Sequence, residues 1–322
     1  MQAEGGMTRR QFLGGGMSAA ALVGLGAGPQ FGNVIPGEET WSESLMLLHF
    51  DPEVRNGVSI RVSRYPDKNV TWVWCHVLFE GRLYAFTERR LPCSTVRNVG
   101  TADQGDYASL SAGLDFVRHG PVDRLDRIEL IADVPSRLGG HGPDGSGRTP
   151  VRVEAVFRPT SRKKNTPAGR SEWTGRAEIG LSVGGRLASL SGPAKAHEQT
   201  QTSPRFDAPF TYAMMWSPGA SFIANASLAR RYGDYEVDGR VHAVKDFRPD
   251  PPAHERAFSA LLDDGRLLKG VASRVAAYEV PVFNRVWRGN IVRVDLDGRR
   301  LVGMLNDWRP EDMVPSQPLR GA

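Results

Sequence analysis

Apolar side chains recur at every second position in short runs along most of this chain. The pattern is clear in residues 71–79, 127–132 and 151–157, and each run ends near glycine, proline or aspartate. Alternation with a period of two is typical of strands, because successive side chains of a strand point to opposite faces. The same pattern returns in the second half of the chain, at residues 221–226, 272–280, 290–295 and 300–305.

Turn residues between these runs indicate antiparallel pairing. Glu80-Gly81-Arg82 separates the apolar runs 70–79 and 83–91, and the Asp-Gly pairs within 263–266 and 296–299 are typical of hairpins. Two stretches, 109–118 and 252–262, resemble short helices. Short strands at this spacing favour barrels or sandwiches, so we predict an all-β, mostly antiparallel fold with few short helices.

The N-terminal residues resemble an export signal. Thr8-Arg9-Arg10-Gln11-Phe12-Leu13 precedes an uncharged run of small and apolar residues, 14–27. This pattern is typical of a twin-arginine signal. The run is shorter than the roughly 18 to 20 residues of a membrane-spanning helix, so no stable membrane anchor is expected. We expect a periplasmic or extracellular protein that meets the twin-arginine translocase during export; a disordered leader is the alternative.

The charge pattern favours neither nucleic acid nor a membrane as a partner. The net charge is +5, and the basic block Arg162-Lys163-Lys164 sits in a stretch rich in Thr, Ser, Pro and Gly that is typical of a solvated loop. No later segment is apolar enough to span a membrane. The roughly 290 residues after the leader suffice for one large core or two of ordinary size.

The chain has two cysteines, Cys75 and Cys93, which could pair in an oxidising compartment. In the hairpin expected around residues 80–82, however, Cys75 would face Thr87, and a disulfide needs Cα atoms within about 7 Å. A disulfide would therefore require a bulge, and a buried free thiol at Cys75 is the other possibility. Neither cysteine has metal-ligand spacing with a histidine pair, so no metal is expected.

Titratable and aromatic residues concentrate between the two β-rich halves, at residues 191–216. The segment is too irregular for a helix, and we expect a loop there. Loops on a rigid scaffold often carry functional residues, and ligand sites are common where domains meet. The candidate site residues of this segment are His197, Glu198, Arg205, Asp207, Phe210, Tyr212 and Trp216.

Three phrases of the sequence resemble one known family. They are residues 41–51, the strand Trp72-Val-Trp-Cys-His-Val-Leu78, and the glycine-then-histidine phrase at 192–199. They are similar to the first strand, the next hairpin and the start of the second domain of the carotenoid hydratase (hydroxyneurosporene synthase) group of two-domain lipocalin-like proteins. Relatives often have Asp-His followed by Trp-Gly, where this chain has Ala196-His197-Glu198-Gln199.

This resemblance implies two lipocalin-like antiparallel β-barrel or sandwich domains packed together. Their expected bounds are 36–190 and 191–315, after a signal and linker at 1–35 and before a tail at 316–322. It also implies an apolar cavity for an isoprenoid-like hydrophobe, and hydration, dehydration, isomerisation or cyclisation of alkenes without a cofactor.

Hydration of an unactivated alkene requires protonation of carbon, so the site needs an acid, a dry pocket and electron-rich walls. A carboxyl group in an apolar pocket keeps its proton near neutral pH, which makes Glu198 or Asp207 the candidate donor. His197 could relay the proton or position water. Ring faces attract positive charge. The candidate walls and substrate contacts are Phe210, Tyr212, Trp216, Trp72, Trp74, His76 and Arg205.

Each of these residues also has a structural interpretation. His197 and His76 can be hydrogen-bonded histidines within strands, and Asp207 can form a salt bridge with Arg205 that holds the loop. Aromatic residues are common in any barrel core. A regular strand would also turn Glu198 away from His197.

The sequence favours an exported, cofactor-independent hydratase, dehydratase or isomerase that acts by acid–base chemistry on an alkene of an isoprenoid-like hydrophobe. A non-catalytic periplasmic carrier of a lipid or terpenoid is the alternative, and a buried acid beside the cavity would separate the two. A carbohydrate-binding sandwich would instead require a rim of exposed tryptophans. The chain has no Gly-x-Ser-x-Gly motif, so a serine hydrolase is not expected.

Overall fold

The computed structural model describes residues 32, 34, 38–93, 97–98, 104–121, 123–139, 147–161, 163–166, 169–202, 208–227, 231–282 and 285–313. Residues 31–322 form one compact unit. The twin-arginine segment and the tail at 316–322 lie outside the described residues. Within the described part, no helix is long and apolar enough to cross a membrane.

The first half of this unit is one large antiparallel sheet, called here the first sheet. Its strands are ordered β4-β3-β2-β1-β11-β10-β8-β7-β6-β5, and β9 pairs with β10. A short pairing of β4 with β7, at Tyr84–Leu138 and Ala85–Arg137, curls the sheet back on itself. Its elements are β1 (Ser42–Phe50), β2 (Gly57–Tyr65), η1 (Pro66–Lys68), β3 (Val70–Phe79), β4 (Arg82–Leu91), β5 (Gln104–Asp106), η2 (Leu110–Ala112), β6 (Leu114–His119), β7 (Arg127–Leu138), β8 (Thr149–Pro159), β9 (Lys164–Thr166), β10 (Arg170–Val183) and β11 (Arg186–Gln201).

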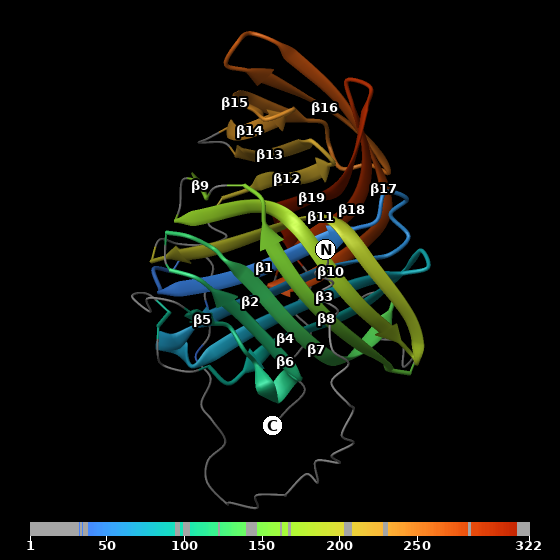
Figure 1. Cartoon of the computed structure of the whole chain (residues 1–322). Coiled ribbons are helices and arrows are strands. Elements are labelled where there is room, and N and C mark those ends of the chain that lie inside the picture. Colours follow the sequence, from blue (N-terminus) through green and yellow to red (C-terminus); the bar gives the residue numbers. More distant parts are fainter. Residues whose placement is uncertain are drawn as a thin grey trace, which may run out of the picture. The chain divides into compact units, whose positions relative to one another are not determined.

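The second half is a closed eight-stranded barrel, drawn in yellow through orange to red in Figure 1. Its strands follow one another in sequence order. They are β12 (Phe210–Ser217), β13 (Ala220–Ser227), β14 (Arg231–Val237), β15 (Arg240–Pro249), β16 (Glu255–Leu262), β17 (Leu267–Val282), β18 (Arg285–Leu296) and β19 (Arg299–Met313).

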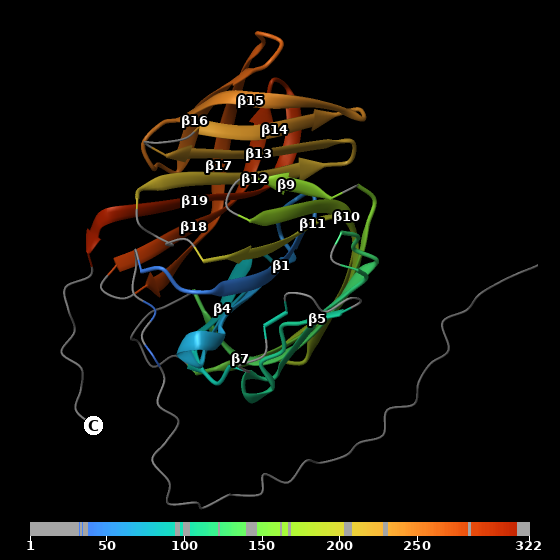
Figure 2. The same cartoon turned by 90° about the vertical axis from the view of Figure 1, so that its left-hand side faces the viewer.

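Three apolar cores follow from this arrangement. One fills the concave side of the first sheet, with Leu47 and Ile60 among its members. Another fills the barrel, with Phe222 and Phe258. The third lies between them, because β12 and β19 of the barrel lie next to β11 and β1 of the first sheet (Figure 2). Strands at this junction are therefore buried on both faces, as the unbroken burial of β1 shows.

The structure confirms the all-β prediction and its strands. The run predicted at 70–79 is β3, and the expected turn at residues 296–299 joins β18 to β19. In that turn Asp297 and Gly298 have φ angles of 49° and 79°. Both residues are left-handed, as a type I′ hairpin turn requires, and Gly and Asp accept this conformation more readily than other residues.

Both predicted helices are wrong. Residues 255–262 form β16, in which Arg256, Phe258, Ala260 and Leu262 alternate inward with period two. Residues 109–118 contain only the three-residue 3-10 turn η2, which ends where Gly113 adopts a φ of 71°, and then β6. In both places apolar residues at helical spacing also fit a strand, and pairing with neighbouring strands decided the outcome.

The expected loop at 191–216 is mostly strand. Residues up to Gln201 continue β11, and β12 begins at Phe210. The expected domain boundary at 190/191 thus falls inside β11 of the first sheet. Pro193 is tolerated in this strand because β1 pairs with β11 only from Lys195 onward. Its carbonyl instead accepts hydrogen bonds from two side chains, His49 and Trp216.

Cys75 is a buried free thiol opposite Phe86 rather than Thr87. The hairpin is shifted by one residue from the expected pairing, so Cys75 does not face Cys93. Burial raises the pKa of the Cys75 thiol to about 12, as expected for an inert structural cysteine.

Candidate active site

A row of five side chains crosses the first sheet on the face that meets the barrel. In register, Glu172 of β10 is opposite His197 of β11, His197 is opposite Met46, Met46 is opposite Arg61, and Arg61 is opposite Trp74. Residues directly opposite each other in an antiparallel pair point to the same face of the sheet. The pairing of five strands therefore gathers two acid–base groups and an arginine under the barrel.

Rows two residues away on either side share this face. One contains Lys195, Leu48, Ser59 and His76. The other begins at Arg170, opposite Gln199. This face thus carries several buried polar and charged groups, while the opposite face carries the apolar residues of the first core together with the buried Glu43–Arg64 ion pair.

The outer face of the barrel covers these rows and leaves a central cavity of about 30 Å³. A space of this size holds one or two water molecules. Three of its lining residues are methionines, whose flexible side chains adapt to different occupants. The lining residues are Met46, Leu48, Ser59, Arg61, Trp74, His76, Arg170, His197, Tyr212, Met214, Tyr278, Trp287, Met304 and Asn306.

Glu172 is the buried acid of this region. Its side chain is 2 % exposed, the Tyr212 hydroxyl donates to its Oε1 at 2.8 Å, and Arg170 Nη1 is 3.7 Å from Oε1. Its Oε2 is buried and makes no hydrogen bond within the described part of the chain. Burial raises the pKa of Glu172, while Arg170, Lys195 and the Tyr212 hydrogen bond act in the opposite direction. The carboxyl group therefore keeps its proton to a higher pH than an exposed glutamate does.

Lys195 and Tyr212 are perturbed by the same surroundings. Burial lowers the pKa of Lys195 to about 8, although the charge of Glu172 favours its protonated form. Burial and the Glu172 charge together raise the pKa of Tyr212 well above its usual value, so Tyr212 stays a hydroxyl donor. Arg170 lies over the Tyr212 ring at 4.5 Å, which fixes the ring against β10.

Aromatic rings line the other side of the cavity. His76 stacks on Tyr278 with ring centroids 3.8 Å apart, and Trp74 lies 5.9 Å from Trp287. Arg61 lies 5.5 Å from the Trp74 ring and donates to Ser44 and Ser63. The cavity therefore has aromatic walls, with the Arg61 guanidinium over one of the rings.

Four of the sequence-derived candidates meet at this cavity: His197, Tyr212, Trp74 and His76. The other three aromatic candidates do not line it, although they belong to the same apolar core or pack against it. Phe210 packs on Trp287 at 5.3 Å, and Trp72 packs on Tyr65 at 5.0 Å. Trp216 stacks on Phe50 and lines a separate groove.

Glu198 does not join His197. It points to the opposite face of β11, where the Tyr107 hydroxyl donates to it at 2.6 Å and Arg118 forms an ion pair at 3.1 Å. This is the orientation expected of a regular strand. Arg205 and Asp207 lie outside the described residues.

The sequence interpretation missed Glu172, Arg170, Lys195 and Arg61. Arg170 and Glu172 share one face of a strand, as do Lys195 and His197, and this spacing of charged residues at i and i+2 was the available signal. On a sheet with one wet face such residues point to solvent, which is the ordinary meaning of the pattern.

A different group could hold a metal ion among the described residues. It consists of His242, Asp263 and Asp264, at the ends of β15 and β16, and its two aspartates are exposed. The group lies outside the lining of the central cavity.

The described residues lack the exposed tryptophans that a carbohydrate-binding sandwich would require. Six of the seven tryptophans, Trp72, Trp74, Trp173, Trp216, Trp287 and Trp308, are buried. Trp41 is half-buried. The structure therefore shows no exposed tryptophan rim within the described residues.

Comparison with solved structures finds the same fold at low sequence identity. CghA, solved with Sch210972, has a TM-score of 0.58 and 10% identity, covering 87% of this chain and 94% of CghA. A protein described as an ATTH from Nitrosomonas europaea gives 0.53 and 12%, covering 91% and 99%. Kievitone hydratase from Nectria haematococca gives 0.50 and 9%, covering 85% and 90%.

No family model matches the sequence, and no curated protein matches it. At identities of 9 to 12%, the structural likeness shows the fold and leaves the activity open. CghA, the ATTH protein and kievitone hydratase therefore share the fold of this chain. The resemblance to the two-domain lipocalin-like carotenoid hydratases stays a prediction.

Proposed function

We propose that this protein is a cofactor-independent acid–base enzyme that hydrates, dehydrates or isomerises an alkene of an isoprenoid-like hydrophobe. The observation that carries the proposal is Glu172, a buried carboxyl with a raised pKa. It is paired with the cavity histidine His197 on the neighbouring strand. Titratable groups that lie next to each other in different surroundings are typical of acid–base sites. Kievitone hydratase, which shares the fold, is a hydratase by name.

In this scheme Glu172 is the proton source and His197 carries the proton into the cavity. Tyr212 holds Oε1, so the acid proton sits on Oε2. Transfer of a proton to one alkene carbon leaves a cation at the other, beside the aromatic rings that line the cavity. Water held in the cavity then bonds to the cation and returns its proton through His197, so that the alcohol forms and the acid is restored.

The size of the cavity fits these roles of water and alkene. The cavity has room for water, and movement of its methionine side chains would admit the alkene. Loss of a proton from the cation instead of attack by water would give isomerisation, and the reverse sequence would give dehydration.

Glu172 also weighs against the carrier. A carrier needs an apolar cavity, and burial of a carboxyl, a lysine and an arginine beside it costs stability with no benefit to apolar binding. A catalyst needs these groups.

The test is incubation of the protein with an isoprenoid and lipid extract in heavy-oxygen water, followed by mass spectrometry. We expect label in a new alcohol, and a fall in the rate of about 10²- to 10⁴-fold in Glu172→Gln. Glu178→Gln is the matched control, because Glu178 is exposed on the same strand. Wild-type labelling by Glu172→Gln would remove Glu172 from the mechanism, and a bound hydrophobe released unchanged would favour the carrier.

We propose further that the chain is exported by the twin-arginine route, on the strength of Arg9, Arg10 and the uncharged run that follows. Replacement of both arginines by lysine is expected to retain the precursor in the cytoplasm. The variant is expressed in cells, and the cells are then fractionated. Export equal to that of the wild type would exclude this route.

A further inference from the structure

The interior of the barrel opens into a pocket at one end. Its apolar core, with Phe222 and Phe258 among the members, fills the rest. Where β12 and β16 begin, a pocket of about 180 Å³ is left, called here the mouth pocket. Tyr278 is the one described residue that lines both this pocket and the central cavity. The mouth pocket lies inside the barrel wall and the central cavity outside it, so the two are different spaces.

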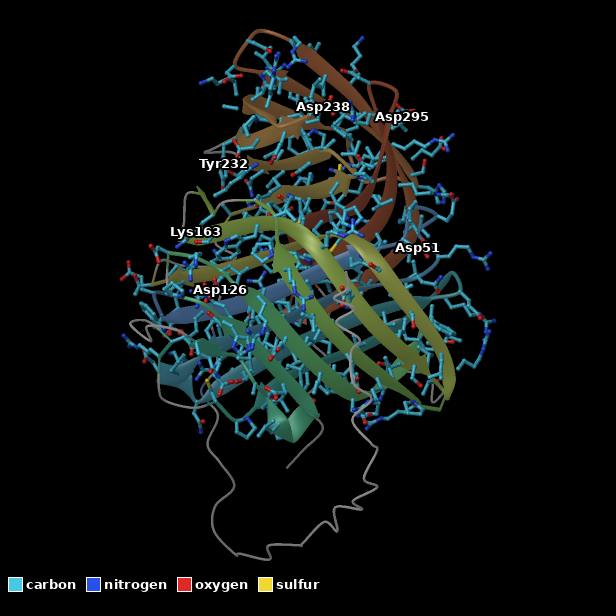
Figure 3. All side chains as sticks on the ribbon, viewed as in Figure 1. Asp51, Asp126, Lys163, Tyr232, Asp238 and Asp295 are labelled. Atoms are coloured by element: carbon cyan, nitrogen blue, oxygen red, sulfur yellow. The ribbon has the colours of Figure 1, made fainter. Side chains whose placement is uncertain are left out.

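The pairing of the barrel strands locates this end. Arg256, which lines the mouth pocket, donates to Thr211 near the start of β12 at 3.3 Å. The pairing of β12 with β13 and of β13 with β14 brings the start of β14 to the same end. Figure 3 labels Tyr232, near the start of β14, to the left of Asp238 and Asp295, which belong to the other end of the barrel.

A β-bulge brings charged side chains into the mouth pocket. Arg274 of β17 is opposite Val292, a member of the barrel core, so both point to the inside of the barrel. The register shifts directly after Arg274. The extra residue of a bulge reverses which face the following residues point to. Ala277 and Glu279 therefore line the mouth pocket, while Tyr278 joins the core between the barrel and the first sheet.

The floor of the mouth pocket is a closed ion pair. The side chains of Arg256 and Asp307 are each 2 % exposed, and Arg256 donates to both oxygens of Asp307. Arg256 also donates to the Asp250 carbonyl at 2.6 Å. The two charges satisfy each other and have little surface to offer to a ligand. Contacts to a ligand must therefore come from the exposed part of the lining.

That exposed part carries one unbalanced positive charge. Arg288 and Glu279, 44 % and 54 % exposed, form an ion pair with each other at 3.2 Å. Arg274 is exposed as well, and its guanidinium makes no ion pair with another described residue. A concave site with an uncompensated cation attracts anions, and a guanidinium can hold a carboxylate through two parallel hydrogen bonds.

Size and the apolar walls limit the ligand further. Pockets for drug-sized molecules commonly measure about 300 to 1,000 Å³. The mouth pocket is smaller, so it admits a small molecule only. Exposed apolar groups stand close to the cation: Ala277 is three positions after Arg274, and the Arg274 amide donates to the His254 carbonyl at 2.8 Å, next to Ala253.

We propose that the mouth pocket binds a small carboxylate with a compact apolar body. The carboxylate pairs with the Arg274 guanidinium, and the apolar body lies between Ala253 and Ala277. The site is independent of the proposed catalytic function, because none of these three residues lines the central cavity.

The test compares benzoate with benzamide, which has nearly the same shape and no charge. Isothermal titration at about pH 7, where benzoate is ionised, should show benzoate bound about 5- to 10-fold more tightly, as charge-assisted hydrogen bonds at a partly exposed site provide. The preference should shrink at high salt, since salt screens an exposed ion pair. Equal affinities, or no saturable binding of benzoate, would overturn the proposal.

Two substitutions of Arg274 test its charge. Arg274→Gln should lower the affinity for benzoate to that for benzamide and leave benzamide unchanged, whereas Arg274→Lys keeps the charge and should retain part of the preference. Arg293→Gln is the matched control, because Arg293 is an exposed arginine of β18 outside the mouth pocket. A preference that survives in Arg274→Gln, or that disappears equally in Arg293→Gln, would contradict the assignment to Arg274.

A pair of alanine variants locates the site. Ala277→Trp places a large ring in the mouth pocket, whereas Ala257→Trp places one at an exposed alanine of β16 outside it. Ala277→Trp should weaken binding of both ligands at least about tenfold, because the ring fills the pocket. If Ala277→Trp does not fold, Ala253→Trp fills the pocket from the segment before β16. Wild-type binding in the variants that fill the pocket would place the ligands elsewhere and overturn the proposal.

Discussion

Glu172 and Asp307 are two buried carboxylates, each next to an arginine, and their bonding differs. Asp307 lies inside the barrel, where Arg256 donates to both of its oxygens, at 3.1 and 2.9 Å, and Thr211 donates to Oδ1 at 2.8 Å. Glu172 lies between the barrel and the first sheet, receives one hydrogen bond from Tyr212, and has an Oε2 without one among the described residues.

This difference distinguishes a buried carboxylate that holds strands together from one that can act as an acid. Arg256 and Thr211 hold both carboxylate oxygens of Asp307, which makes Arg256–Asp307 a fixed link between β16 and β19. Burial raises the pKa of Glu172, which leaves it a proton to give. A buried carboxylate is a candidate acid when its surroundings fail to satisfy its charge.

Asp307→Asn tests the structural side of the comparison and has the largest expected effect. Loss of the negative charge leaves the Arg256 guanidinium buried and uncompensated, which costs about 3 to 5 kcal/mol of unfolding free energy. Urea denaturation measures it. The double variant Arg256→Met/Asp307→Leu, which removes both charges, should recover most of this loss, and failure to do so would show that the pair acts by more than its charge.

Lys195 gives a pH signature to the region around Glu172. Its pKa is lowered to about 8 in the folded protein from an ordinary value of 10.5, so between these values the unfolded chain binds the extra proton. Stability should therefore rise with pH across this window, by up to about 3 kcal/mol. Urea unfolding at a series of pH values between about 7 and 10.5 measures this rise in stability. Lys195→Met should lack the rise, and the exposed control Lys269→Met should keep it.

Tyr212→Phe removes the single hydrogen bond to Glu172. We expect a loss of about 1 kcal/mol of unfolding free energy, typical of one hydrogen bond. The Tyr212 bond lowers the pKa of Glu172, so its removal should raise that pKa further. The pH at which turnover falls should then move upward in the pH–rate profile. A profile that stays in place would show that Glu172 does not supply the proton.

Glu172→Gln has the smallest expected effect on stability, within about 1 kcal/mol of the wild type, since the amide still accepts from Tyr212. The raised pKa of Glu172 makes wild-type stability fall as pH rises from its ordinary value of 4.5 through the folded pKa, because the folded state holds the proton there. Glu172→Gln should not show that fall in urea unfolding. A loss as large as that of Asp307→Asn would erase the distinction between the two carboxylates.

The strands and hairpins could be predicted from local sequence because their signals are local. Alternation over 70–79 specifies β3, and Asp297-Gly298 specifies the turn after β18. Local signals were ambiguous at 252–262, where helical and strand spacing overlap. They were also misleading at 191–201. Gly192-Pro193 indicates an irregular segment there, but pairing with β10 makes it a strand.

The candidate site was predictable only in part. His197 and Tyr212 were found because they stand close together in an unusual stretch of sequence. Glu172 was not found, because it is 25 positions before His197 and becomes its neighbour only through the pairing of β10 with β11.

By itself, the sequence determined the strand content, most hairpin turns and a set of candidate aromatic and histidine side chains, because each depends on residues a few positions apart. The tertiary structure alone decided that the polar face of β2 is buried. Ser59, Arg61 and Ser63 alternate with apolar residues like the solvent side of a strand, yet they are buried or half-buried beneath the barrel. Whether a polar face meets water or a second domain is a non-local property, and here it turns a solvated pattern into a site.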